Sequence, residues 1–285
     1  IMENMNTRVR GKKDIENLTL PFVGEIPLSY RKKKRLPFRK PQPEPSSIVV
    51  KEKNRNVINE AFRVVRTNLE FMQGKNGHSP IIMVTSMNPG SGKTFITMNL
   101  ATSLAIKGKK VLAIDLDLRK ASLSTYIQSP EKGITNYLIG QVNTYNEVIV
   151  KGKTHPNLDI LPVGTIPPNP TELLFENHLE QMLSELKNQY DYIFIDCPPV
   201  EIVADTSIIN KYADQTLFVI RAGLLERAML PEIEKFYQTH KYKNMFLLLN
   251  GTTDAYTRYG YHKYGYRYGY HYGYGSGYHN SSDEK

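Results

Sequence analysis

The middle of the sequence alternates between short apolar runs and longer amphipathic stretches. The apolar runs have the length of buried strands and fall at 81–85, 111–116, 158–162, 192–195, 216–220 and 245–249. Between them, apolar residues recur at helical spacing over about 57–73, 93–107, 171–188 and 226–240. Continuous apolar strands separated by helices are typical of a parallel sheet covered on both faces. We therefore predict a doubly wound α/β fold whose ligand site lies beyond the carboxyl ends of the strands.

Charge divides the chain into three parts. Residues 1–55 carry 14 Lys or Arg against 6 Asp or Glu, residues 56–255 carry 19 against 20, and residues 256–285 carry 4 against 2. The first part is interpreted as a basic juxtamembrane linker with an edge strand near residues 22–27, because the run from Arg31 to Arg35 is followed by prolines. The run is either a solvated linker or a patch attracted to anionic lipid, at roughly 1 kcal/mol per Lys or Arg. Nucleic-acid binding is not expected, because no base-reading motif accompanies the charge.

Composition excludes several classes of protein. The chain has 285 residues, enough for a substantial core, and its single Cys excludes a disulfide framework and any multi-Cys metal site. No apolar run approaches the roughly 18 to 20 residues that span a bilayer, so we expect the chain as given to be soluble. It begins with Ile and lacks the apolar stretch of a secretory signal, which favours a fragment of a longer protein.

Tyrosine dominates the last part of the chain. Most of these tyrosines are separated by Gly, His, Arg or Lys, and no aliphatic residue follows Ala255, so we predict a disordered tail. Taken alone, such a segment is more typical of a low-complexity module that binds partners by stacking than of an enzyme substrate. The tail tyrosines are Tyr256, Tyr259, Tyr261, Tyr264, Tyr266, Tyr268, Tyr270, Tyr272, Tyr274 and Tyr278.

A phosphate-binding loop lies between the run at 81–85 and the helical stretch that follows. Glycines let the loop curl so that its N–H groups point at phosphate oxygens, and the helix N-terminus adds a favourable dipole. Lys93 is expected to pair with the β- and γ-phosphates and the Thr94 hydroxyl to bind Mg²⁺, although Met87 stands where the motif has its first Gly. Asn250 lies where a nucleotide base could pass, but a turn-forming Asn explains it equally well. The residues expected to bind the nucleotide are Pro89, Gly90, Ser91, Gly92, Lys93, Thr94, Phe95 and Asn250.

Acidic residues end two other predicted strands. Asp115 and Asp117 follow the run at 111–114, and Asp196 follows the run at 192–195. In a parallel sheet these carboxylates emerge at the same edge as the phosphate loop, where they can hold a hydrated Mg²⁺. A single Asp in such a place would more often cap a helix. Three of them beside a phosphate loop favour a metal and catalytic cluster.

Together, these segments resemble the Walker A, A′ and B motifs of the bacterial tyrosine kinases (BY-kinases), the cytoplasmic part of polysaccharide co-polymerases. Residues 161–174 are similar to the family's GxxPPNPxELL segment, and residues 60–66 fit its ExxRxxR motif. The resemblance covers about residues 7–275 and implies a P-loop NTPase-like fold. The related cell-division and partitioning ATPases carry a second lysine five positions before the loop lysine, where this chain has Asn88.

The resemblance and the chemistry of phosphoryl transfer suggest a role for each site residue. Lys93 and the loop amides would hold ATP, and Thr94, Asp117 and Asp196 would hold Mg²⁺. Asp115 would accept the proton of the incoming tyrosine, although either Asp115 or Asp117 could lean toward the metal. The tail tyrosines would then be the phosphate acceptors.

The resemblance also implies partners. Glu60, Arg63 and Arg66 lie three apart on one arc of a helix, and spacing alone indicates a solvated face with an ion pair worth a few tenths of a kcal/mol. The family implies that they instead join subunits into a ring, which places one subunit's tail in the next subunit's site. It further implies a membrane-spanning portion, a tyrosine phosphatase, a location at the inner face of the bacterial inner membrane and a role in capsular or exopolysaccharide assembly. The alternative function is a nucleotide-gated scaffold whose tail binds partners.

Overall fold

A single mostly parallel sheet runs through the molecule. The computed structural model describes residues 7–28, 47–72, 80–166, 168–175, 177–201 and 203–253. Within these residues, eight strands pair in the order β1-β8-β7-β2-β6-β3-β5-β4, and only β4 is antiparallel to its neighbour. The strands are β1 (Phe22–Pro27), β2 (Ile81–Thr85), β3 (Val111–Asp115), β4 (Val150–His155), β5 (Leu158–Leu161), β6 (Tyr192–Asp196), β7 (Gln215–Arg221) and β8 (Met245–Thr252).

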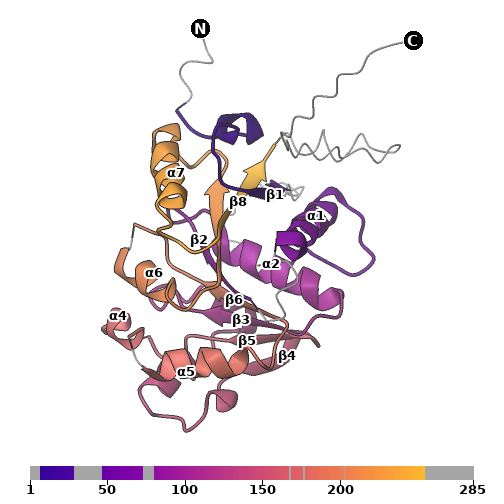
Figure 1. The fold of residues 1–285 in the computed structure, drawn as a ribbon. Coiled ribbons are helices and arrows are strands. Elements are labelled where there is room, and N and C mark those ends of the chain that lie inside the picture. The colour runs from indigo at the N-terminus through magenta and orange to yellow at the C-terminus, as the bar shows by residue number, and fades with distance from the viewer. Residues whose placement is uncertain are drawn as a thin grey trace, which may run out of the picture.

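Helices cover both faces of this sheet. They are α1 (Val57–Met72), α2 (Lys93–Ile106), α3 (Ile134–Leu138), α4 (Pro170–Leu173), α5 (Asn177–Leu186), α6 (Val203–Ile209) and α7 (Leu230–Gln238). Short 3₁₀ turns lie at Lys12–Ile15, Leu123–Ile127, Tyr145–Glu147 and Arg227–Met229. Figure 1 shows α1 and α2 on one side of the sheet and α5, α6 and α7 on the other. The predicted doubly wound α/β fold is therefore confirmed.

Each face of the sheet has its own apolar core. Successive side chains of a strand point to opposite faces, so Ile81 and Met83 of β2 join the core beneath α5 and α7, whereas Ile82 and Val84 join the core beneath α1 and α2. Because both faces are buried, the central strands are apolar up to their last residues, Thr85, Asp115 and Asp196, which is why continuous runs predicted them.

The segment before α1 contributes to both cores. Leu20 is buried beneath the α7 face, while Val23 and Ile26 of β1 are buried beneath the α1 face. The amide oxygen of Asn99 on α2 accepts hydrogen bonds from the backbone N–H groups of Val49 and Val50 at 2.8 and 3.1 Å. These contacts attach residues 7–28 and 47–56 to the same body as the central sheet.

The structure differs from the predicted elements in the helices and at one sheet edge. The helix expected over 171–188 is two helices, α4 and α5, and the helix expected over 226–240 begins as α-helix only at Leu230. Pro231 stands in the first turn of α7, where its fixed φ and missing N–H favour a helix start. Strand β4 was not predicted because its middle residues are exposed and its sequence is polar. The part of the chain that the structure describes contains no helix that is both long and apolar enough to cross a bilayer.

Candidate active site

The loop between β2 and α2 is held in shape by contacts with the end of β8. Gly92 has a φ of 87°, in the left-handed region, and a Cβ there would lie 2.3 Å from the Asn250 side-chain nitrogen. That nitrogen donates a hydrogen bond to the carbonyl of Ser91 at 2.9 Å, and the Ser91 hydroxyl donates to the carbonyl of Asn88 at 2.8 Å. Asn250 therefore lies within β8 and fixes the phosphate loop, rather than forming a turn. Position 92 accepts only glycine for both conformational and steric reasons.

Lys93 and Thr94 open α2 and point toward the acidic strand ends. Lys93 is 8% exposed, and its burial lowers the pKa of its ammonium group, opposed by the nearby charges of Asp196 and Asp117. The Thr94 hydroxyl donates a hydrogen bond to Oδ2 of Asp196 at 2.5 Å. The structure therefore brings the predicted loop lysine and threonine next to Asp196 of β6.

Asp115 and Asp196 are paired in register at the carboxyl ends of β3 and β6, and both are buried. Burial raises the pKa of Asp115 to about 7, against the lowering effect of the hydrogen bonds from Ser124. Burial, with the charge of Asp115, raises the pKa of Asp196 to about 8. Burial thus opposes ionisation of both carboxyl groups, and the charge of Lys93 partly offsets this effect on the pKa of Asp196.

Ser124 is a site residue that the sequence analysis missed. Its backbone N–H and its hydroxyl both donate to Oδ2 of Asp115, at 2.8 and 2.7 Å, and its hydroxyl accepts a hydrogen bond from the N–H of Val163 at 2.9 Å. Ser124 therefore fixes the orientation of the Asp115 carboxyl group. The only sequence signal was its nearness to Asp115 along the chain, nine residues away.

A cavity of about 470 Å³ opens beside the loop and has the size of a small-molecule site. Lys93, Thr94, Phe95 and Asp117 line it, together with Lys120. Asp117 is thus the acidic residue that faces the cavity, whereas Asp115 lies behind it in the sheet. Of the predicted nucleotide-binding residues, Gly90, Gly92, Lys93, Thr94 and Phe95 line this cavity, whereas Pro89, Ser91 and Asn250 do not.

The residues present fit a magnesium ion that arrives with phosphate. Oδ1 of Asp115 and Oδ1 of Asp196 are buried and accept no hydrogen bond within the described part of the chain. Among the described residues, no group of three or more His, Cys, Asp or Glu side chains is arranged to hold a metal by itself. Mg²⁺ typically keeps several waters and takes one or two carboxylates plus substrate phosphates, so a Thr94–Asp196 arrangement with a neighbouring carboxylate suffices. A dedicated metal cage is not needed at this edge.

Arg221 is a second residue that the sequence analysis missed. Arg221 is the last residue of β7. Its guanidinium lies against Gly251, because a Cβ added to that glycine would be 2.7 Å from Cζ of Arg221. The same guanidinium reaches toward Gly92 of the phosphate loop. Its burial lowers the pKa of the guanidinium, and within the described residues its side chain has no hydrogen bond or ion pair. Because the carboxyl ends of parallel strands meet at one edge of the sheet, the place of Arg221 at the end of a predicted strand could have identified it as a site residue.

The predicted interface residues lie on α1. Arg63 pairs with Glu60 at 2.5 Å and donates to the carbonyl of Asn54 at 3.2 Å. Arg66 instead donates to the carbonyl and the hydroxyl of Ser103 on α2, at 2.9 and 3.2 Å. Arg66 therefore fastens α1 to α2 within the chain, while Glu60 and Arg63 remain at the surface.

The tail tyrosines 256–278 and the basic run at 31–40 lie outside the described residues.

Comparisons with known proteins agree with this geometry. Residues 79–244 match a family model described as an AAA domain. The chain is 35% identical over 211 residues to the tyrosine-protein kinase CpsD of Streptococcus agalactiae, an alignment that covers 73% of this chain and 90% of that protein. It is 33% identical over 218 residues to the tyrosine-protein kinase YwqD of Bacillus subtilis, covering 76% of this chain and 91% of that protein. The kinase domain of the Escherichia coli tyrosine kinase ETK superposes with a TM-score of 0.73 at 30% identity, covering 92% of this chain and all of that one.

Proposed function

The chain belongs to the bacterial tyrosine-protein kinases, and from this premise we propose that it phosphorylates tyrosines in the C-terminal tail of a neighbouring copy of itself. The observation that carries the proposal is the meeting of Lys93 and Thr94 with Asp196 and Asp115 at one edge of the sheet. Phosphoryl transfer depends mainly on positioning and on neutralising charge, and these residues supply both.

Each site residue is assigned one task in this proposal. Lys93 and the loop N–H groups hold the β- and γ-phosphates, and Thr94, Asp117 and Asp196 hold Mg²⁺, directly or through water. When bound, Mg²⁺ neutralises charge on the phosphate oxygens. The phenol oxygen then forms a bond to the γ-phosphorus while the bond from that phosphorus to the bridging oxygen of ADP breaks. The phenol proton passes to Asp115, whose Oδ1 accepts no other hydrogen bond in the described chain.

The tail supplies acceptors in an unusual number. It has ten tyrosines, many of them next to a Gly, whose lack of a side chain leaves the neighbouring phenol freer to enter a cleft. Each phosphate adds about −1.5 to −2 charge, so a few of them reverse the net +2 of residues 256–285. We propose that this change in charge alters how copies associate and so regulates the assembly and export of a capsular or extracellular polysaccharide. A tyrosine phosphatase would reverse the change.

Phosphorylation between copies can be tested directly by mass spectrometry. We expect the full chain, incubated with ATP and Mg²⁺, to gain phosphate on several tail tyrosines. A ¹⁵N-labelled Lys93→Met copy, mixed in as an acceptor that cannot transfer phosphate itself, should gain phosphate as well. An unmodified tail on the labelled copy would contradict the proposal that phosphate is transferred between copies. An unmodified tail on both copies, with ATP binding intact, would instead support the nucleotide-gated scaffold.

Assembly into a ring is proposed to depend on Glu60 and Arg63. Arg66 is less suited to test it, because its change would also loosen α1 from α2. Such a ring would form on the inner face of the bacterial inner membrane, where a membrane-spanning portion would hold the copies together.

We expect Arg63→Glu to shift the chain from oligomers to monomers in light scattering and to slow tail phosphorylation. Arg8→Glu is the matched control, because it also breaks an exposed ion pair, the one between Arg8 and Glu226. Exposed ion pairs of this kind contribute little to stability. An Arg63→Glu protein that keeps the oligomeric state of the parent would defeat the ring proposal.

A further inference from the structure

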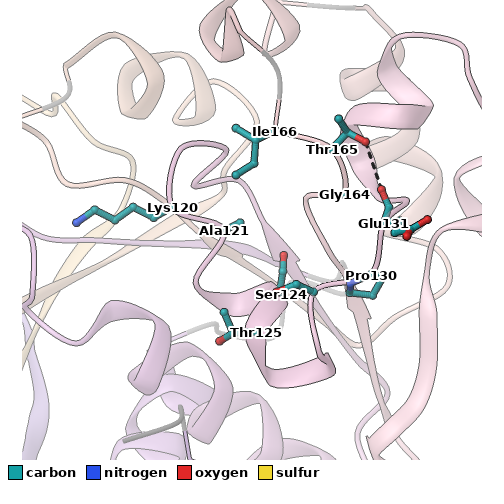
Figure 2. A pocket seen from close by; sticks show the side chains of 10 residues that line it. Lys120, Ala121, Ser124, Thr125, Pro130, Glu131, Gly164, Thr165 and Ile166 are labelled. Carbon is teal, nitrogen blue, oxygen red and sulfur yellow. Dashed lines mark hydrogen bonds between the residues drawn. The ribbon is translucent and has the colours of Figure 1, made fainter. Parts of the chain in front are cut away.

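A second cavity lies beside the nucleotide cavity and plays no part in the function described so far. Its volume is about 480 Å³, within the range of small-ligand sites, and Lys120 lines both cavities. Figure 2 shows Ile166 and Ser124 on opposite sides of this space, with Glu131 at a third side. The two cavities therefore adjoin at Lys120, and the second cavity offers space for a reactant other than the nucleotide.

The bottom of this cavity lies close to Asp115, the proposed acceptor of the phenol proton. Ser124 lines the cavity, and its N–H and hydroxyl hold Oδ2 of Asp115. A group that reaches the bottom of the cavity is thus one residue away from Asp115 and next to the nucleotide cavity.

The wall opposite Ser124 is held by close backbone packing and by hydrogen bonds. Gly164 has a φ of 80°, and a Cβ there would lie 2.2 Å from the backbone nitrogen of Gly133. The Thr135 hydroxyl donates to the carbonyl of Thr165 at 2.7 Å, and the Thr165 hydroxyl donates to the carbonyl of Glu131 at 3.3 Å, a bond drawn in Figure 2. The cavity is consequently formed before any ligand binds, as expected of a recognition site.

The chemistry of the lining indicates which part of a ligand each side would contact. Ile166 is 54% exposed and offers an apolar surface to a ring, while the Ser124 hydroxyl at the floor is already bonded to Asp115 and Val163. The Glu131 carboxylate offers an anionic partner to a basic neighbour of that ring. The tail has this composition, since its tyrosines stand among Arg258, Lys263 and Arg267.

We propose that this cavity binds the acceptor tyrosine of a Tyr-Gly-rich tail segment, with Ile166 against the phenol ring and Glu131 near a flanking basic residue. The inference rests on the proposed function and adds to it the surface that selects the substrate. Glycine beside the tyrosine lets the peptide backbone come close to the cavity, and Lys120, which lines both cavities, would stand between the phenol and the nucleotide phosphates.

Peptide kinetics can test this assignment. The enzyme is the full chain with its ten tail tyrosines changed to Phe, so that it cannot phosphorylate itself, and the substrate is a synthetic peptide of residues 256–274. We expect Ile166→Glu to raise KM for the peptide by roughly tenfold or more, because the ring loses its apolar contact, with KM for ATP within about twofold of the parent. Ile139→Glu is the matched control: Ile139 is 49% exposed but lies outside the cavity, so both constants should stay unchanged.

A second pair of measurements tests the charge contact. Glu131→Gln should raise KM for the basic peptide by about threefold to fivefold and leave unchanged KM for a peptide whose Arg and Lys are changed to Gln. An active parent whose peptide KM is unaffected by Ile166→Glu would overturn the cavity assignment but not the kinase proposal. A rise in KM for ATP alone would show that the cavity serves the nucleotide. A parent that phosphorylates no peptide, while the unaltered chain phosphorylates its own tail, would overturn the cavity assignment alone, and failure of both reactions would remove both proposals.

Discussion

Asp115→Asn is expected to reduce phosphotyrosine formation by about 10²- to 10⁴-fold while changing ATP affinity little. The amide keeps the shape of the side chain and can still accept the hydrogen bonds of Ser124, but it cannot take the phenol proton. Steady-state kinetics with the tail peptide measure the first effect, and titration calorimetry with Mg-ATP measures the second. Asp159→Asn is the control, because Asp159 is also buried at the sheet but accepts its hydrogen bonds from Tyr190 and Gly152, away from the site.

Two other outcomes of this experiment would change the assignment. If Asp115→Asn lowers ATP affinity and transfer together, Asp115 acts on the metal rather than on the proton. If it leaves transfer intact while Asp117→Asn abolishes it, the two aspartates exchange roles. The second outcome has a structural basis, because Asp117 lines the nucleotide cavity and Asp115 is buried behind it.

The central sheet could be predicted because its strands are buried on both faces. Such strands are apolar up to their carboxyl ends, so the runs at 81–85, 111–116 and 192–195 stood out without any alternation of polar and apolar residues. β4 could not be found in this way. It lies at the edge of the sheet, its middle residues face solvent, and its sequence contains two lysines and a glycine.

The convergence of Lys93, Thr94 and Asp196 was predictable for a general reason. The carboxyl ends of parallel strands share one edge, so a loop and an aspartate that follow different strands must meet there. The contacts of Ser124 and Arg66 were not predictable, because they depend on how a 3₁₀ turn folds over β3 and how α1 crosses α2. These are tertiary contacts between elements that sequence periodicity describes one at a time.

Lys93→Met is expected to lower ATP affinity by about 10- to 100-fold and to abolish phosphotyrosine formation, because a buried charge-assisted contact to phosphate is lost at nearly constant volume. Its effect on the stability of the nucleotide-free chain should be smaller than for a typical broken buried ion pair, which costs about 3–5 kcal/mol. The reason is that burial already raises the pKa of Asp196 to about 8, so this carboxyl can stay protonated at neutral pH when the ammonium group is gone. Lys107→Met, at the other end of α2, removes only a surface ion pair with Glu70 and should leave ATP affinity and thermal stability near those of the parent. Calorimetry with Mg-ATP and thermal unfolding at pH 7 measure both properties, and an unchanged ATP affinity in Lys93→Met would show that the nucleotide binds elsewhere.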